Sequence, residues 1–489
     1  QPPGPLTRHH MQARGTTVRA LLSPSGRSRL APPASRSGAA LGGTSSAMLG
    51  TAILGAARRL SRQTPRLSAA ARSVRMSAAS SDAPAADVAP SEVPRKAGVT
   101  EGAWDKIDVQ AVQEAEVDAN RAGVVSTRLV GMSVKELEEM AESTGEKKYR
   151  GKQVHDALYK RKVQGLDDIV QVPKAWRAAL RELGIDTGRS KVHHIAEAKD
   201  GTAKFLLKLE DGYVVETVGI PSFESSKPRL TVCVSSQVGC PMRCTFCATG
   251  KGGFARNLRP HEIVDQVLTI EAHFGRRVSN VVFMGMGEPL LNLRGVMAAH
   301  RALNVDVGIG ARNMTISTVG VPNAILKMAE YEHQSTLAVS IHAPNQALRE
   351  KLIPSARAYP IEALMEDCTE YWKRTGRRVS FEYTLLGGVN DAPAQAHELA
   401  DLLYSHRLGG HVNLIPYNWV DDSEYKRPSN ESVKSFLNVL MQRNVPASVR
   451  QTRGHEASAA CGQLRNSFQK KGAAMEEGEG AEGESAVPV

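Results

Sequence analysis

Three cysteines stand close together in the segment Cys240-Pro-Met-Arg-Cys244-Thr-Phe-Cys247, which has C-x3-C-x2-C spacing. A β-branched run (230–236) precedes them, and a glycine-rich stretch (250–253) follows. An iron–sulfur cluster that only transfers electrons takes four cysteine ligands. Three thiolates leave one metal position open, so the spacing indicates a cluster whose remaining iron binds an exchangeable substrate or cofactor.

The spacing alone leaves other metal sites open. A structural zinc site commonly combines C-x2-4-C with a second such pair or with a distant pair of histidines, and the chain has no second C-x2-C. A plain electron-transfer cluster and a disulfide within this group are further alternatives. Six cysteines in 489 residues, three of them clustered, do not form a disulfide scaffold, which favours a reducing compartment.

The positive charge of the chain is concentrated at its beginning. Residues 1–81 contain twelve arginines, no lysine and no acidic residue. This composition is typical of an organelle transit peptide, and a plastid is favoured over a mitochondrion. Without these arginines, 50 of the 62 basic residues stand against 51 acidic ones. An acidic linker (82–125) and an acidic tail (467–489) flank a mildly basic body, which is compatible with a polyanionic partner.

Behind the linker, apolar periodicity predicts a small helical domain over 126–192, with Ser133 as an N-cap. Seven Lys and Arg residues lie between positions 147 and 162 of this domain. They could contact phosphates or could simply form a solvated helix surface. Residues 193–229 predict a β connector with a hairpin, because two strand-like runs flank Glu210-Asp-Gly.

The region 230–466 alternates short β-rich runs with amphipathic segments, so it predicts an α/β core of six consecutive βα units. An open doubly wound sheet and a partial barrel both fit this order. Polar and cysteine residues follow the predicted strands, where α/β proteins collect ligands. The six predicted strand and helix pairs are 230–235 with 261–274, 280–284 with 294–304, 314–318 with 322–332, 337–341 with 361–375, 379–385 with 394–406, and 411–415 with 431–443.

Residues 132–464 resemble the radical S-adenosylmethionine RNA methyltransferases of the RlmN/Cfr type. The resemblance rests on the cysteine segment 233–247 together with Gly252-Gly-Phe-Ala-Arg-Asn-Leu258, Gly285-Met-Gly-Glu-Pro-Leu-Leu-Asn292, Ser340-Ile-His-Ala-Pro-Asn345 and Arg453-Gly-His-Glu-Ala-Ser-Ala-Ala-Cys461-Gly-Gln-Leu464. The fold that it implies is a partial (β/α)6 radical S-adenosylmethionine barrel. The helical domain would then be an RNA-binding accessory domain.

The resemblance also implies the cofactors. In the family, three cysteines hold a 4Fe–4S cluster whose open iron binds S-adenosylmethionine, and Cys240, Cys244 and Cys247 match these ligands. The residues that match the family's contacts to S-adenosylmethionine are Gly287, Glu288, Ser317, Ser340, Ile341, His342 and Asn418.

Two further cysteines match residues that the family uses to methylate an electron-poor carbon of the adenine ring. Cys461 matches the cysteine that is first methylated, and Cys233 matches the cysteine that resolves the covalent RNA adduct through a transient disulfide. Glu216 matches the proton acceptor, although a six-residue insertion lengthens its separation from Cys233. The expected activity is methylation of adenine carbon 2 in large-subunit ribosomal RNA, with transfer RNA as a further substrate.

Carbon 8 of the same base is the closest alternative target. A non-catalytic, metal-containing RNA-binding protein is a second alternative, but such a protein has no use for Cys461 and Cys233. The resemblance further implies an electron donor such as flavodoxin or ferredoxin. We expect a monomer. We also expect no membrane span, because no apolar run is long enough to cross a bilayer.

Overall fold

The computed structural model describes residues 127–223, 228–420 and 423–464. The predicted transit peptide (1–81), the acidic linker (82–125) and the acidic tail (467–489) lie outside these residues. None of the described helices combines the length and hydrophobicity needed to cross a bilayer.

A ten-stranded sheet forms the centre of the fold, and its strands lie side by side in chain order. Neighbouring strands are antiparallel from β1 to β4 and parallel from β4 onward. A doubly wound sheet would reverse its strand order at a switch point, so this uniform order confirms the partial barrel and excludes the alternative. The strands are β1 (Lys191–Glu197), β2 (Ala203–Lys208), β3 (Val214–Ser222), β4 (Arg229–Cys233), β7 (Asn280–Phe283), β8 (Met314–Thr318), β9 (Thr336–Ser340), β10 (Ser380–Leu385), β11 (His411–Pro416) and β12 (Ala447–Val449).

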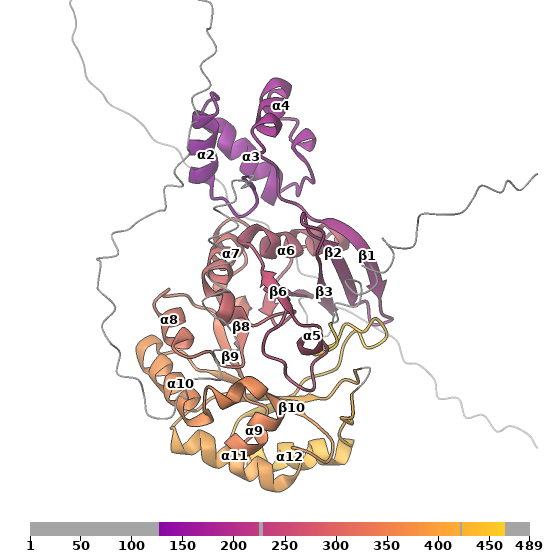
Figure 1. Ribbon diagram of the computed structural model, residues 1–489, viewed down its shortest axis with the longest axis vertical. Helices are drawn as coiled ribbons and strands as arrows, with labels where there is room; N and C mark the ends of the chain where they lie inside the picture. The colour runs from indigo at the N-terminus through magenta and orange to yellow at the C-terminus, as the bar shows by residue number, and fades with distance from the viewer. Residues whose placement is uncertain (1–126, 224–227, 421–422, 465–489) are drawn as a thin grey trace, which may run out of the picture. The chain divides into compact units, whose positions relative to one another are not determined.

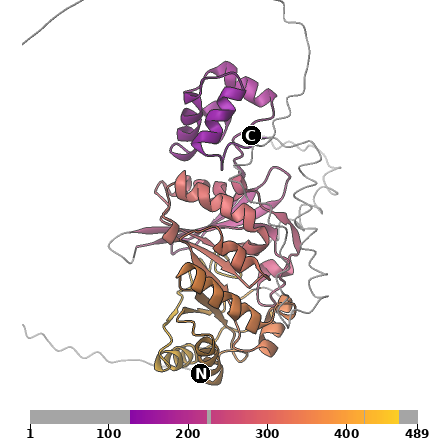
Figure 2. The same cartoon turned by 90° about the vertical axis from the view of Figure 1, so that its left-hand side faces the viewer.

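Helices cover the outside of the curved sheet, as Figure 1 shows for α6, α7, α8, α10, α11 and α12. Figure 2 gives the view from the side. All six predicted strand and helix pairs are present, and β12 is an additional parallel strand beside β11. The helices of this region are α5 (Ala248–Lys251), α6 (Pro260–Phe274), α7 (Leu293–Val305), α8 (Ala324–Ala329), α9 (Gln346–Leu352), α10 (Ile361–Thr375), α11 (Pro393–Ser405) and α12 (Asn430–Gln442).

Local sequence explains where these helices begin and end. Helix α6 starts with Pro260 in its first turn and stops at Gly275, which adopts a left-handed conformation with φ of 59°. Proline suits a first turn because the missing N–H would be unpaired there, and glycine tolerates positive φ. Helix α12 is capped by Ser429, whose hydroxyl accepts a hydrogen bond from the Ser432 N–H.

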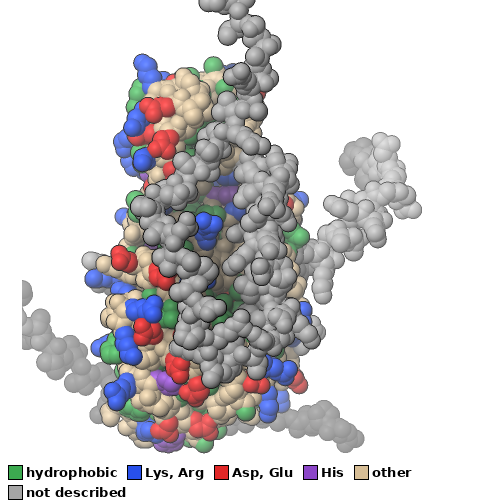
Figure 3. Space-filling view, turned by 60° about the vertical axis from the view of Figure 1, so that its left-hand side comes forward, with side chains coloured by type: hydrophobic (Ala, Val, Ile, Leu, Met, Phe, Trp, Pro, Cys, Tyr) green, Lys and Arg blue, Asp and Glu red, His purple; other side chains and the backbone are tan. Residues whose placement is uncertain are grey.

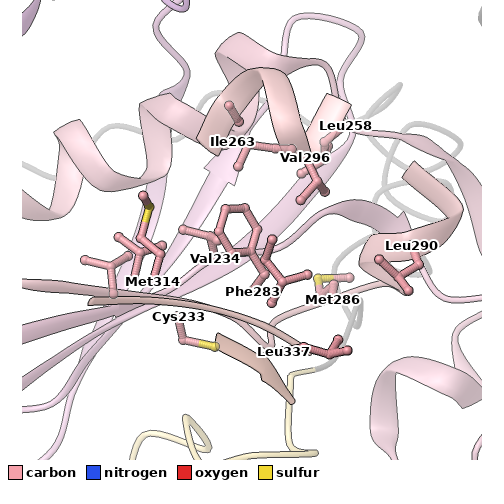
Figure 4. Packing of buried hydrophobic residues seen from close by; sticks show 14 of the residues in the cluster. Cys233, Val234, Leu258, Ile263, Phe283, Met286, Leu290, Val296, Met314 and Leu337 are labelled. Atoms are coloured by element: carbon pink, nitrogen blue, oxygen red, sulfur yellow. The ribbon is translucent and has the colours of Figure 1, made fainter. Parts of the chain in front are cut away.

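Cys233, the last residue of β4, and Val234, which follows it, point to opposite faces of the sheet. Figure 4 shows Val234 on the side of helices α6 and α7, near Ile263 and Val296, whereas Cys233 points to the opposite side. Val234, Ile263 and Val296 are fully buried. Successive side chains of a strand point to opposite faces. Cys233 therefore lies on the face of the sheet away from the helices.

Three helices precede the sheet, in the region where the sequence predicts a helical domain. They are α2 (Val134–Ser143), α3 (Tyr149–Tyr159) and α4 (Lys174–Glu182). Ser133 caps α2 as expected: its hydroxyl accepts the Glu136 N–H, and the Glu136 carboxylate accepts the Ser133 N–H at 2.7 Å. The predicted hairpin is β2 and β3, and β1 adds a third antiparallel strand, so these strands extend the core sheet.

Candidate active site

A pocket opens at the carboxyl ends of the parallel strands. This end of an α/β barrel is where ligands bind. Ten of the sequence-predicted site residues line the pocket: Cys240, Cys244, Cys247, Gly287, Glu288, Ser317, Ser340, His342, Asn418 and Cys461.

Three predicted site residues do not line this pocket. Ile341 is fully buried, and its N–H donates to the Glu382 carbonyl at 3.1 Å. Cys233 lines a second pocket that adjoins the first. Glu216 lines neither pocket; its side chain is buried beside Lys204, with 3.6 Å between the Lys204 Nζ and the Glu216 Oε2.

The cysteine loop gathers three thiols in the first pocket. Burial raises the pKa of the Cys240 and Cys244 thiols, and the neighbouring Cys247 thiol raises both further. The loop is held against helix α9, because the Thr245 N–H donates to the Leu352 carbonyl at 3.0 Å. Among the described residues, no three His, Cys, Asp or Glu side chains are arranged to hold a single metal ion.

This donor set fits a polynuclear iron–sulfur group. Thiolates are the ligands of such clusters, and bound iron keeps buried thiols deprotonated, which counters the effect of burial on their pKa. All six cysteines are free thiols, so none of the three is committed to a disulfide.

Glu288 places a buried carboxylate in the wall of the pocket. Its Oε1 accepts the Leu290 N–H at 3.0 Å, and its Oε2 accepts the Val319 N–H at 2.9 Å. Burial nevertheless raises the pKa of Glu288 to about 7. A cationic group in the pocket would favour the charged carboxylate, so this position suits an ammonium.

Gly287 allows the backbone to approach Gln237 closely. Its φ is +107°, and a Cβ at this position would lie 2.6 Å from the Gln237 Cβ. The Gln237 Oε1 accepts the Glu288 N–H at 2.8 Å, which fixes the loop. A glycine is therefore required here for both conformation and space.

His342 lines the pocket as a neutral ring. Its Nδ1 accepts the Thr384 N–H at 2.9 Å, so the remaining proton belongs on Nε2. Burial lowers the pKa of His342 to about 3. The ring packs edge-on against Phe246, with 5.0 Å between the ring centroids. His342 is thus a hydrogen-bonding and packing group and not a charged one at neutral pH.

Polar side chains at the ends of β8, β9 and β11 lie in the pocket, and the one after β11, Asn418, contacts the last described segment. The Ser317 and Ser340 hydroxyl oxygens lie 3.3 Å apart. The Asn418 Nδ2 donates to the Cys461 carbonyl at 3.3 Å, and its Oδ1 accepts from Arg427 at 3.1 Å. Asn418 therefore positions the backbone at Cys461.

Cys461 stands in the wall shared by both pockets. The second pocket is lined by Cys233, Arg450 and Cys461, among others. Burial raises the pKa of the Cys461 thiol, and the Arg450 guanidinium acts against this increase. Burial also raises the pKa of Cys233 to about 12. The arrangement brings two thiols, one adjacent guanidinium and the cluster cysteines to a single region.

Sequence reasoning missed two charged residues of this region. Arg450 follows the short strand β12, and its Nη1 lies 3.4 Å from the Met284 sulfur. Glu382 lies in β10 and lines the first pocket; its Oε1 accepts from Asn413 at 2.8 Å, and its buried Oε2 has no hydrogen-bond partner among the described residues. An acidic residue within the apolar run Phe381-Glu-Tyr-Thr-Leu385 is the signal that could have identified Glu382.

Two parts of the chain match known families. Residues 234–400 match the radical SAM superfamily, and residues 127–185 match the ribosomal RNA large subunit methyltransferase N-terminal domain. A probable dual-specificity RNA methyltransferase RlmN from Nostoc punctiforme is 57% identical over 343 residues, which cover 69% of this chain and 93% of that protein. The protein of the same name from Gloeobacter violaceus is also 57% identical, over 70% of this chain and 96% of its own length.

A solved structure agrees with these matches. The radical SAM methyltransferase from Sphaerobacter thermophilus aligns with a TM-score of 0.66 at 41% identity, over 70% of this chain and 99% of that chain. The chain therefore belongs to the radical S-adenosylmethionine superfamily and, within it, to the RlmN family of RNA methyltransferases.

Proposed function

We propose that this enzyme methylates carbon 2 of an adenosine in large-subunit ribosomal RNA, and that transfer RNA is a further substrate. The observation that carries the proposal is the position of Cys461, in the wall between the pocket of the three clustered cysteines and the pocket of Cys233. The ribosomal RNA methyltransferase domain match and the dual-specificity relatives support the two substrates.

Cys240, Cys244 and Cys247 would hold a 4Fe–4S cluster. Seven residues would bind S-adenosylmethionine, with Glu288 as the partner of its amino group. They are Gly287, Glu288, Ser317, Ser340, Ile341, His342 and Asn418. When bound, the cluster supplies the electron and S-adenosylmethionine supplies both the methyl group and the adenosyl radical of the reaction. The raised pKa of Glu288 supports a contact with this N–H donor, because burial leaves the charge of the carboxylate poorly compensated.

Cys461 has to act as the first acceptor of the methyl group. Carbon 2 of adenine lies between two ring nitrogens and is electron-poor, so it cannot displace a sulfonium as a nucleophile does. A thiolate can, and the Arg450 guanidinium favours the thiolate of Cys461. The methyl carbon on Cys461 has to lose one hydrogen atom before it can bond to the ring. Bound S-adenosylmethionine would supply the radical that takes this atom, and the cluster would take back the one electron left over on the RNA adduct. Cys233 then attacks the Cys461 sulfur as a thiolate. A disulfide forms between the two sulfurs as the carbon–sulfur bond breaks, and the carbon keeps the electron pair of that bond and takes up a proton to become the methyl group.

Glu216 is the proposed proton acceptor for the ring hydrogen. It shares one face of the sheet with Cys233, because Val218 pairs with Cys233 and lies two residues from Glu216 on the same side of β3. A general base needs reach and a suitable charge state. Sharing this face supports the assignment of Glu216.

The experiment that tests the proposed function is nucleoside analysis of RNA treated with the reconstituted enzyme. Anaerobic reaction with ribosomal RNA that lacks the native methylation should yield 2-methyladenosine. A product methylated on carbon 8 would replace the proposed target by the alternative. RNA bound without any methylation, by a colourless protein, would instead favour the metal-containing binding module.

The accessory helices support RNA binding only modestly. Several of their basic side chains are engaged in ion pairs, including Lys148 with Glu138 at 3.8 Å and Lys160 with Asp156 at 2.8 Å. In Figure 3, basic and acidic side chains are interspersed on the visible face of the molecule. We propose that the accessory domain (126–192) contacts RNA phosphates through the remaining basic residues, such as the exposed Lys147 and Arg161.

We also propose a plastid location, with a ferredoxin or flavodoxin as electron donor and a monomeric enzyme. The Arg-rich, acid-free composition of residues 1–81 supports an organelle, and the cyanobacterial origin of the quoted relatives favours the plastid over the mitochondrion.

The substitution Glu288→Gln should weaken binding of S-adenosylmethionine by about 10- to 100-fold, because a charge-assisted hydrogen bond is lost. With a pKa of about 7, the wild-type carboxylate becomes protonated as the pH falls through neutrality. Wild-type affinity should therefore be lower at pH 6 than at pH 8, and the Gln variant should lose this difference. Calorimetric titration of the reconstituted proteins at both pH values measures the effect. Equal pH dependence in the two proteins would contradict the contact between Glu288 and the amino group.

A further inference from the structure

One face of the antiparallel strands collects three chemically active side chains. Lys204 of β2 pairs with Val218 of β3, and Val218 pairs with Cys233 of β4. Lys204 and Cys233 therefore lie in one row across the sheet, on either side of Val218. Glu216 lies two residues before Val218 and points to the same face. Lys204 and Glu216 are thus diagonal neighbours on adjacent strands, a position from which long side chains can meet.

The Lys204 ammonium connects two parts of the site. Its Nζ lies 3.6 Å from the Glu216 Oε2, and it donates to the Ser458 carbonyl at 3.2 Å. The side chains of Lys204 and Glu216 are 11% and 4% exposed, so solvent screens their attraction little. Ser458 stands three residues before Cys461. A single buried cation therefore joins the Glu216 carboxylate to the segment that bears Cys461.

Other contacts fix the same segment on this side of the sheet. The turn between β1 and β2 holds it, because the Gly454 N–H donates to Asp200 and the Lys199 N–H donates to Glu456, each at 2.9 Å. Both of these contacts involve the exposed turn. Lys204 differs from them because its charge is buried and faces a carboxylate.

We propose that Lys204 is a positioning residue that holds the Glu216 carboxylate in its charged form and fixes it relative to the Cys461 segment. The inference rests on the proposed function, since it assumes that Glu216 accepts the ring proton. In that step the carbon–hydrogen bond at the ring carbon breaks, its electron pair stays with the adduct, and the proton moves to a Glu216 oxygen. An ammonium beside a carboxylate favours the ionised form, which is the form that can accept this proton.

Charged and titratable groups from several elements lie beside this row. The adjoining pocket contains Cys233 from β4, Cys247 from the cysteine loop, and Arg450, Arg453 and Cys461 from the segment after β12. The first pocket adds Glu382 from β10. Helix α6 packs against the other face of β3, where a Cβ on Gly219 would lie 2.5 Å from the Phe274 ring. Lys204 forms an ion pair with Glu216 from the face opposite this helix.

The test compares Lys204→Met, which keeps the length of the side chain without its charge, with Lys204→Arg. Lys208→Met, an exposed lysine on the same strand, is the matched control. Two measurements separate methylation of Cys461 from the later proton transfer. Mass spectrometry of the Cys461 peptide reports its methylation. Single-turnover release of methylated RNA reports the proton transfer, which precedes release. Both are measured from pH 6 to pH 9.

Lys204→Met should methylate Cys461 at the wild-type rate but release methylated RNA more slowly, by up to about tenfold on the acid limb of the pH profile. The acid limb of the release profile should move upward by about one pH unit, because the Glu216 carboxylate holds its proton to higher pH once the Lys204 ammonium is gone. Lys204→Arg should restore the wild-type profile, and Lys208→Met should leave it unchanged.

Three results would overturn the inference: an unchanged acid limb in Lys204→Met, an equal effect in Lys208→Met, or loss of Cys461 methylation in parallel with release. The last of these would assign Lys204 a purely structural role. Failure of the wild-type enzyme to methylate Cys461 at all would instead contradict the proposed function, so the two failures are distinguishable.

Discussion

Replacing Cys461 by alanine should abolish RNA methylation, with a loss of at least about 10³-fold in turnover. The thiol is the proposed covalent carrier, and removing a residue that forms the covalent intermediate costs an enzyme most of its rate acceleration. The variant should also take up no methyl group from S-adenosylmethionine. Nucleoside mass spectrometry of the RNA and intact-protein mass spectrometry measure both effects.

Cys368→Ala is the appropriate control for this experiment. Cys368 is fully buried in α10 and lines neither pocket, so its loss should leave a small cavity without removing a reacting group. We expect methylation by Cys368→Ala to stay within about threefold of wild type, the range in which a small packing defect acts. Comparable losses in both variants would mean that general destabilisation, and not the chemistry of Cys461, explains the result.

Replacing Cys247 by alanine should eliminate the iron–sulfur group. Cys247 lines both pockets and is one of three proposed ligands, so two thiolates would have to hold a cube that normally takes ligands on each iron. The reconstituted wild-type protein should contain about four iron atoms per chain, and the variant should retain less than about one. Iron and sulfide analysis and visible absorption measure the loss, and formation of 5′-deoxyadenosine should fall below detection.

Cys233→Ala provides the contrast to Cys247→Ala. Cys233 lies on the wall of the second pocket only, so its loss should leave the iron content unchanged while blocking release of the RNA. Covalent protein–RNA adducts should then accumulate, which denaturing gels detect. If Cys233→Ala lost its iron as Cys247→Ala does, the separation of cluster ligands from the resolving thiol would be wrong.

Much of the fold was predictable because the core repeats one simple pattern. Apolar runs such as 280–284 and 314–318 are bounded by turn residues and followed by amphipathic helices, and the structure confirms all six pairs. Strand β12 was missed because three residues, Ala447–Val449, are too few to show a period. The choice between an open sheet and a barrel came from the strand order, which no local pattern contains.

The site was predictable where the motif residues are contiguous, as in the cysteine loop. Cross-strand partners were not predictable, because the pairing of Lys204 with Glu216 depends on the register between two strands. The proximity of Arg450 to Cys461 likewise depends on how the segment after β12 folds over the end of the sheet, because the two residues line one pocket. Ile341 is fully buried and lines neither pocket, and its place among the contacts to the cofactor stays a prediction.

The central claim is that the methyl carbon passes through Cys461 and loses one hydrogen before it reaches RNA. The most direct measurement is the deuterium content of the methyladenosine formed from S-adenosylmethionine with a fully deuterated methyl group, using enzyme whose Cys461 was methylated with the same reagent. Our account predicts that the transferred group retains two of the three deuterium atoms and that the third appears in 5′-deoxyadenosine. A product that retains all three would show direct transfer of an intact methyl group and would contradict the account.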